Sequence, residues 1–140
     1  MHLATYVGFN GQCAEALRYY EKHLGGTITA MFTFADMPGG EEMPPEARGG
    51  IMHARLELGG TTLMGSDTPP GMDRADPSGF HVSVHPTSVD EADRVFAALS
   101  DGGSVEMPIQ ETFWAARFGM VVDRFGIPWM VNCEKPHEIG

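Results

Sequence analysis

The feature that most constrains how this chain can fold is a segment that recurs in its two halves. The sequence EALRYYEKHLGGTI, residues 15–28, matches EADRVFAALSDGGSV, residues 91–105, in the order Glu-Ala, Arg, an aromatic residue, Leu and Gly-Gly. The matched glutamates lie 76 residues apart, and the matched Gly-Gly pairs lie 77 apart. This period is too long for a solenoid repeat, and it is about half of the 140-residue chain. We therefore predict an internal duplication with pseudo-twofold symmetry.

Each copy of the repeat has the pattern of an amphipathic helix. In the second half, Ser88 and Glu91 form a Ser-x-x-Glu capping box, and Gly102-Gly103 marks the predicted helix end. Apolar residues follow the cap at helical spacing, at Ala92, Val95, Phe96 and Leu99. The first helix is predicted from about residue 13 to residue 24, before Gly25-Gly26, and its predicted buried residues are Ala16, Leu17, Tyr20 and Leu24.

Segments with β-strand composition surround both helices in the same order. One precedes each helix, ATYVGF in the first half and GFHVSVH in the second. Three follow each helix: TITAMFTF, IMHARLEL and TTLMGSD, then SVEMPI, ARFGMVVD and IPWMVN. Gly59-Gly60 and DRFG, residues 123–126, are predicted hairpin turns. We predict an α+β fold of two tandem βαβββ modules, whose curved mixed sheets are covered by helices.

The duplication also predicts the domain organisation. We expect a single domain over residues 1–140, made of module 1–67 and module 79–136. The segment SDTPPGMDRADPSG, residues 66–79, is the predicted linker between them. The segment DMPGGEEMPPEARGG, residues 36–50, is rich in Gly, Pro and Glu, and we predict that it is a mobile loop.

The composition narrows the classes of partner. The chain has 9 Lys and Arg against 19 Asp and Glu, a net charge of −10, so we expect neither nucleic acid nor a membrane surface as a partner. No apolar run approaches the ~20 residues that cross a bilayer, and the first residues lack the pattern of a signal peptide. Two cysteines, Cys13 and Cys133, are too few for a disulfide framework. We expect a cytoplasmic protein.

Four strings of this sequence together resemble the vicinal oxygen chelate superfamily, and within it the PhnB-like branch: AEALRYYEKHLGG, GFHVSV, HARLELGGTTLMGSD and ETFWAARFGMVVDRFGIPWMVN. The superfamily contains glyoxalase I, extradiol dioxygenases, and fosfomycin and bleomycin resistance proteins. The resemblance covers nearly the whole chain and implies the duplicated βαβββ fold. Because open half-barrel sheets leave strand edges and apolar surface that partners cover, we also predict a homodimer.

Some members of the PhnB-like branch carry a ubiquinone methyltransferase label, which this sequence does not support. A Rossmann-type methyltransferase binds its adenosyl cofactor at a Gly-rich turn between a strand and a helix. The sequence has no such turn, and 140 residues leave no room for that fold. We expect that the protein is not a ubiquinone methyltransferase.

The resemblance implies four positions for a metal site, one on each of four strands. Metal-dependent relatives place two histidines and two glutamates there, whereas aligning this sequence gives Thr5, Met64, His81 and Met130. Hard divalent ions prefer oxygen and nitrogen ligands, so we expect no divalent metal and no other cofactor. A metal site in which His53 replaces one of the missing ligands stays an alternative.

Strand alternation predicts which residues line a ligand pocket. Met130 and Asn132 are predicted to face inward, and Trp129 and Val131 to face the helix layer. Phe80, Val82 and Val84 are predicted under the second helix, which leaves His81 and Ser83 toward the concave side. Nearby, Phe113 and Trp114 are either pocket walls or core residues, and Glu111 is the candidate acid–base partner of His81. The predicted ligand-binding residues are Thr5, Met64, His81, Ser83, Phe113, Trp114, Met130 and Asn132.

Two functions remain open from the sequence. The first is small-molecule binding in a concave, largely apolar cleft without a divalent metal, as bleomycin resistance proteins represent. The second is an isomerase, lyase or dioxygenase-type enzyme that uses His81 and Glu111, with or without a metal. Cys13 at the start of the first helix is either a thiol with a lowered pKa or an inert small residue.

Overall fold

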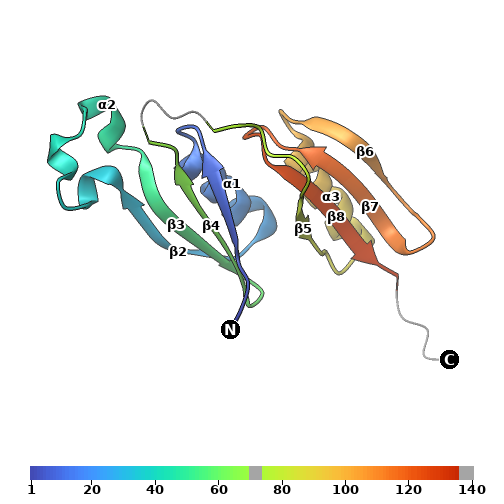
Figure 1. Cartoon of the computed structure of the whole chain (residues 1–140). Coiled ribbons are helices and arrows are strands. Elements are labelled where there is room, and N and C mark those ends of the chain that lie inside the picture. Colours follow the sequence, from blue (N-terminus) through green and yellow to red (C-terminus); the bar gives the residue numbers. More distant parts are fainter. Residues whose placement is uncertain (70–73, 136–140) are drawn as a thin grey trace. The chain divides into compact units, whose positions relative to one another are not determined.

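The computed structural model of the chain describes residues 1–69 and 74–135. The chain forms two compact units, Met1–Ala75 and Asp76–Gly140, and in each unit one long helix packs on a sheet (Figure 1). Residues 70–73 of the predicted linker and residue 136 of the predicted second module lie outside the described residues. That the two modules make a single domain stays a prediction.

Unit 1 contains one four-stranded sheet, in the order β1-β4-β3-β2. Strand β1 pairs parallel with β4, while β2 with β3 and β3 with β4 pair antiparallel. Helix α1 packs against β2, β3 and β4. The elements of this unit are β1 (Thr5–Phe9), α1 (Cys13–Leu24), β2 (Thr27–Thr33), β3 (Ile51–Leu58) and β4 (Thr61–Asp67).

Unit 2 repeats this arrangement, with strand order β5-β8-β7-β6 and a parallel β5–β8 pair. Its elements are β5 (Val82–Val84), α3 (Val89–Ser100), β6 (Ser104–Gln110), β7 (Ala115–Val122) and β8 (Pro128–Glu134). The edge order and the position of the parallel pair are the same as in unit 1. The predicted α+β fold of two βαβββ modules is therefore confirmed.

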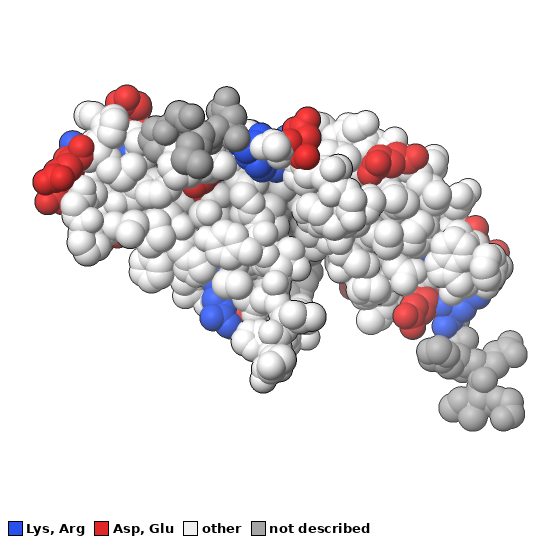
Figure 2. Space-filling model, viewed as in Figure 1, with Lys and Arg blue, Asp and Glu red and all other residues white. Residues whose placement is uncertain are grey.

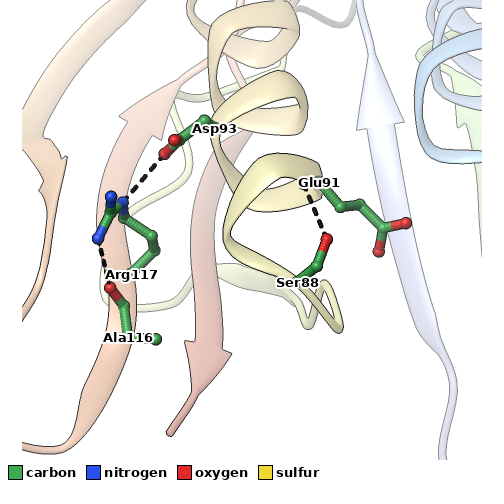
Figure 3. A network of polar contacts seen from close by, with 5 residues as sticks. All are labelled: Ser88, Glu91, Asp93, Ala116 and Arg117. Carbon is green, nitrogen blue, oxygen red and sulfur yellow. Dashed lines mark hydrogen bonds and ion pairs between the residues drawn. The ribbon is translucent and has the colours of Figure 1, made fainter.

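Helix α3 begins where the sequence places a cap, whereas the Gln12 side chain makes no capping hydrogen bond at the start of α1. In α3, the Ser88 Oγ accepts a hydrogen bond from the Glu91 N–H at 3.1 Å. The Glu91 carboxylate accepts from the Thr87 N–H at 3.2 Å, one residue earlier than a capping box requires. Figure 3 shows the Ser88 hydroxyl under the first turn of α3 and the Glu91 side chain extending from that turn. In the described residues, no helix is long and apolar enough to cross a membrane.

Helix α3 is also attached to the sheet by a polar contact. The Arg117 side chain of β7 donates from Nε to the Asp93 carboxylate of α3 at 3.2 Å, and Figure 3 shows the two groups pointing toward one another. The register pairs Arg117 with Cys133 of β8, which is buried. Arg117 therefore lies on the helix-covered side of the sheet.

Buried aspartates hold the ends of strands in both units. In unit 1, the Asp67 carboxylate accepts from the Cys13 N–H at 2.9 Å, which satisfies the start of α1, and from the Ile51 N–H at 2.8 Å. In unit 2, Asp123 Oδ1 accepts from the Phe125 and Ile127 N–H groups, both at 2.9 Å. Its Oδ2 accepts from Trp129 Nε1 at 2.8 Å. The Asp67 carboxylate thus joins segments that are separate in the sequence, whereas the Asp123 carboxylate holds the turn between β7 and β8.

Four details of the fold differ from the sequence predictions. Leu24 is only half-buried, because α1 ends there and Gly25 has a positive φ of 93°. Residues 66–67 belong to β4 rather than to the linker. The predicted loop 36–50 is partly helical. It contains the last residue of the short helix η1 (Phe34–Asp36) and the whole of the short helices η2 (Gly40–Glu42) and α2 (Pro45–Arg48). Phe80 is 48% exposed rather than packed under α3, because β5 begins only at Val82.

Candidate functional site

Strand register separates the side chains of unit 2 into two faces. Trp129 and Val131 of β8 are buried, and Val121 of β7, which pairs with Trp129, is buried with them. This confirms the predicted helix-side position of Trp129 and Val131. Between these residues, Met130 pairs with Ser83 of β5 and with Met120 of β7, so the three side chains share the other face of the sheet. We call this face, which lies away from α3, the strand face of unit 2.

A histidine and a glutamate meet across this face. The His81 Nε2 lies 3.3 Å from the Glu106 Oε1, and the side chains are 23% and 45% exposed. His81 immediately precedes β5, and Glu106 is in β6, the two edge strands of the sheet. Edge strands of a flat four-stranded sheet lie roughly 14 Å apart, so the contact requires a strongly curled sheet. Because α3 packs on the other face, the contact lies on the strand face.

A β-bulge positions Glu106. The register pairs Val105 with Val121 and Met107 with Met120, so Glu106 is an extra residue that has no partner on β7. A bulge bends its strand and redirects the side chains around it, and bulges are frequent beside functional sites. Glu106 was not among the residues predicted from the sequence, where Glu111 was the candidate partner of His81. Glu111 is exposed and follows β6, and the carboxylate that contacts His81 is that of Glu106.

The other polar groups predicted for the pocket also lie along this face. Ser83 Oγ is 2.9 Å from His85 Nε2, two residues along the same segment. Asn132 pairs with Phe118 of β7, and its Oδ1 is buried without a hydrogen-bond partner among the described residues. The register therefore places Ser83, Met130 and Asn132 on one face, as the alternation predicted. Whether they contact a ligand stays a prediction.

Two exposed aromatic side chains connect the strand face to the β6–β7 loop. Phe113 is 89% exposed and Trp114 is 48% exposed. Their rings meet edge to face at 4.9 Å, and Trp114 in turn meets Phe118 at 5.3 Å. Phe118 shares a face with Asn132 by register. The exposure of Trp114 contradicts the core-packing alternative and is consistent with the predicted wall position.

In unit 1, the strand register separates two of the predicted site residues, Thr5 and Met64. Thr5 pairs with Leu63, whereas Met64 pairs with Tyr6, so the Thr5 and Met64 side chains lie on opposite faces. Thr5 shares its face with buried Val7 and Phe9. The residue beside Met64 is therefore Tyr6 rather than Thr5.

Tyr6 also contacts His53, which the sequence analysis considered as a substitute metal ligand. The Tyr6 and His53 rings are stacked with centroids 5.9 Å apart, and the Tyr6 hydroxyl lies 3.4 Å from His53 Nδ1. His53 thus has an aromatic and polar partner on its own sheet.

The described residues do not bring together the oxygen and nitrogen ligands that a hard divalent ion prefers. Within residues 1–69 and 74–135, the structure contains no group of three or more His, Cys, Asp or Glu side chains that could hold a metal ion. The positions implied by the family resemblance offer one imidazole, two thioethers and a threonine whose side chain lies away from Met64. These residues do not fit a hard divalent ion.

Cys13 at the start of α1 is not an activated thiol. Burial, and then the negative charge of Asp67, raise the pKa of Cys13 to about 12. The thiolate is the nucleophilic form of cysteine, so the thiol is inert near neutral pH. This favours the second of the two alternatives considered from the sequence.

Comparison with known proteins identifies the family. Residues 2–131 match the family described as the glyoxalase/bleomycin resistance protein/dioxygenase superfamily. The chain is 37% identical to protein YjdN of Escherichia coli strain K12, over 96% of this chain and 97% of YjdN. It is similar to the crystal structure of protein PA1353 from Pseudomonas aeruginosa, with a TM-score of 0.87, 48% identity, and coverage of 96% and 98%.

A second solved structure shares the fold at lower identity. It is described as a putative 3-demethylubiquinone-9 3-methyltransferase, PhnB protein, from Bacillus cereus. The TM-score is 0.80 at 22% identity, with 95% of this chain and 99% of that chain covered. The duplicated fold, the family match and these relatives agree, and the chain belongs to the glyoxalase/bleomycin resistance protein/dioxygenase superfamily.

Proposed function

We propose that this protein binds a small, partly apolar molecule on the strand face of unit 2, without a divalent metal. The observation that carries the proposal is the contact of His81 with Glu106 above a sheet face that also carries methionines and borders an exposed tryptophan. A few polar groups converging on a mainly apolar surface are the usual composition of a small-molecule site.

The apolar part of the proposed site is adaptable. Met120 of β7 lies directly opposite Met130 of β8, and Met107 of β6 lies opposite Met120. Three neighbouring thioether side chains can adjust their shape to a ligand, because methionine is unbranched and polarizable. Trp114 adds a rigid aromatic surface at the edge of the face. These side chains support an apolar or aromatic ligand body.

The charges of unit 2 favour a neutral or cationic ligand over an anionic one. Glu106 lies on the strand face, while Arg94 is in α3, Arg117 contacts Asp93, and Arg124 contacts Asp101. On the side of the molecule shown in Figure 2, Lys and Arg appear only in small separate groups. With a net charge of −10, the protein disfavours anions at long range as well.

The alternative function is an isomerase, lyase or dioxygenase-type enzyme. The contact of His81 with a carboxylate is the observation that favours it, because such a pair can accept and return a proton. In this version Glu106 takes the place that the sequence prediction gave to Glu111. Chemical turnover of a bound ligand by the purified protein would distinguish this enzyme from a binding protein.

We propose that the methyltransferase description of the Bacillus cereus structure does not extend to this chain. At 22% identity that similarity shows a shared fold. The fold is a pair of four-stranded mixed sheets, which differs from the parallel sheet and Gly-rich turn of a Rossmann-type methyltransferase.

Truncating Trp114 is expected to weaken binding more than folding. With phenol as the probe, Trp114→Ala should raise the Kd roughly 5-fold or more, because burial of an aromatic surface is worth on the order of 1–3 kcal/mol. The unfolding free energy should change by less than about 1 kcal/mol, since the side chain is 48% exposed. Isothermal titration and thermal melts of the same samples measure both. An unchanged Kd would remove Trp114 from the site.

We also propose that the protein is a homodimer. The support is the set of large apolar side chains that are about half-exposed in each unit, Tyr6 and Phe32 in unit 1, and Phe80 and Trp114 in unit 2. Light scattering at micromolar concentration should give about twice the 15.2 kDa mass of the chain. A mass near 15.2 kDa throughout a dilution series contradicts the dimer.

A further inference from the structure

We infer that Glu106 is the positioning residue for His81, and that it prepares His81 to accept a hydrogen bond from an O–H or N–H group of the ligand. The inference rests on the proposed binding function and adds the residue that orients the site and the chemical class of ligand group that it recognises. It is carried by the geometry of the bulge, by the contact across the sheet and by the chemistry of a carboxylate.

The first step is the direction of the His81–Glu106 hydrogen bond. A carboxylate has only acceptor sites, so the proton between Nε2 and Oε1 belongs to the imidazole. In the neutral imidazole, one nitrogen carries the proton and the other accepts. When the imidazole is neutral, Glu106 therefore holds His81 in the form that carries its proton on Nε2, and Nδ1 is left as the acceptor.

The second step is the placement of Glu106. A regular β6 would have no extra residue between Val105 and Met107, which pair with the adjacent residues Val121 and Met120. The bulge supplies this extra residue, Glu106, on β6, which is the edge strand opposite to the edge beside which His81 lies. A side chain that is half-exposed gains little stability from a surface ion pair. The contact is therefore better explained by orientation of His81 than by stabilisation of the fold.

The third step is the ligand group. Nδ1 of His81 is an acceptor, and the Glu106 carboxylate beside the ring is also an acceptor with a negative charge. A ligand donor, a hydroxyl or an N–H group on an apolar or aromatic body, complements both the acceptors and the neighbouring methionines. A ligand carboxylate or phosphate in the same place would face the negative charge of Glu106, while Arg117 and Arg124 of this unit are paired with Asp93 and Asp101.

The test uses the full chain and separates positioning from binding. In nitrogen NMR spectra of His81 recorded at a pH at which the imidazole is neutral, the unmodified protein should show Nδ1 as the unprotonated nitrogen. Glu106→Ala should give a mixture of both imidazole forms, and Glu106→Gln should restore the single form, because its amide oxygen still accepts from Nε2. Glu111→Ala is the rival variant. If it produces the mixture and Glu106→Ala does not, the inference is overturned and the pairing of His81 with Glu111 is correct.

Three matched aromatic probes then test the ligand group. Phenol presents an O–H donor, anisole has none, and benzoate is an anion of similar size. Phenol should bind most tightly, and Glu106→Ala should weaken it roughly 2- to 10-fold while anisole is unaffected. Anisole or benzoate binding as tightly as phenol would overturn the inference while leaving the proposed function intact. If none of the probes shifts the backbone signals of Ser83, Met120 or Met130, the proposed function fails, and the imidazole spectra still decide the role of Glu106.

Discussion

Replacing Trp129 with alanine is expected to lower the unfolding free energy of unit 2 by about 3–5 kcal/mol. The side chain is 2% exposed, and both Val121 across the sheet and Val131, two residues along β8, are fully buried. Its Nε1 donates to Asp123 Oδ2 at 2.8 Å, so the substitution leaves a cavity and removes a hydrogen bond from a buried carboxylate. Chemical denaturation followed by circular dichroism measures the change.

The matched control is the other tryptophan of the chain. Trp114 is 48% exposed and has no role in the helix-side core of unit 2. Trp114→Ala should therefore be much the milder of the two changes. If Trp114→Ala proves the more damaging, then Trp114 is a core residue and its assignment to the ligand site is wrong.

Replacing Asp123 with alanine is expected to cost about 3 kcal/mol or more. Asp123 is 4% exposed and accepts three hydrogen bonds, from the Phe125 and Ile127 N–H groups and from Trp129 Nε1. Each buried donor that loses its acceptor costs ~1–3 kcal/mol, and the substitution affects three of them at once. The same denaturation measurement applies, and a double substitution with Trp129→Ala should be less than additive because the two residues share one hydrogen bond.

Asp101→Ala provides the control for charge at this end of unit 2. The Asp101 side chain is 75% exposed, and its carboxylate lies 3.1 Å from Arg124. An exposed ion pair contributes about 0–1 kcal/mol, so this variant should melt close to the unmodified protein. If Asp101→Ala lowers the unfolding free energy as much as Asp123→Ala does, then the negative charge at this end of unit 2 stabilises the turn, rather than the three buried hydrogen bonds of Asp123.

The helices and the order of helix and strands along each module could be predicted because local signals and the duplication agree. The Ser88 cap, the apolar spacing from Ala92 to Leu99, and the Gly-Gly after each helix gave boundaries that the structure reproduces. Strand alternation placed Trp129 toward the helix and Met130 away from it, which the register confirms. These features depend on residues within a few positions of one another.

The site was harder to predict because it depends on register and on a bulge. Thr5 and Tyr6 are equally compatible with the strand pattern, and only the pairing of β1 with β4 shows that Tyr6 lies beside Met64. Glu106 enters the site because β6 has one residue more than its partner strand at that point. Alternation counted along the sequence loses its phase at a bulge, so the nearest signal available was Pro108, which interrupts the regular pattern of an edge strand.

The most direct test of the central claim is chemical-shift mapping of phenol binding on the full chain after chelator treatment. The account predicts saturable shifts of Ser83, Met120, Met130 and the Trp114 indole N–H, with the α3 signals unchanged and no requirement for added metal. Shifts confined to α3 or to unit 1, or binding that appears only when a divalent ion is restored, would contradict it.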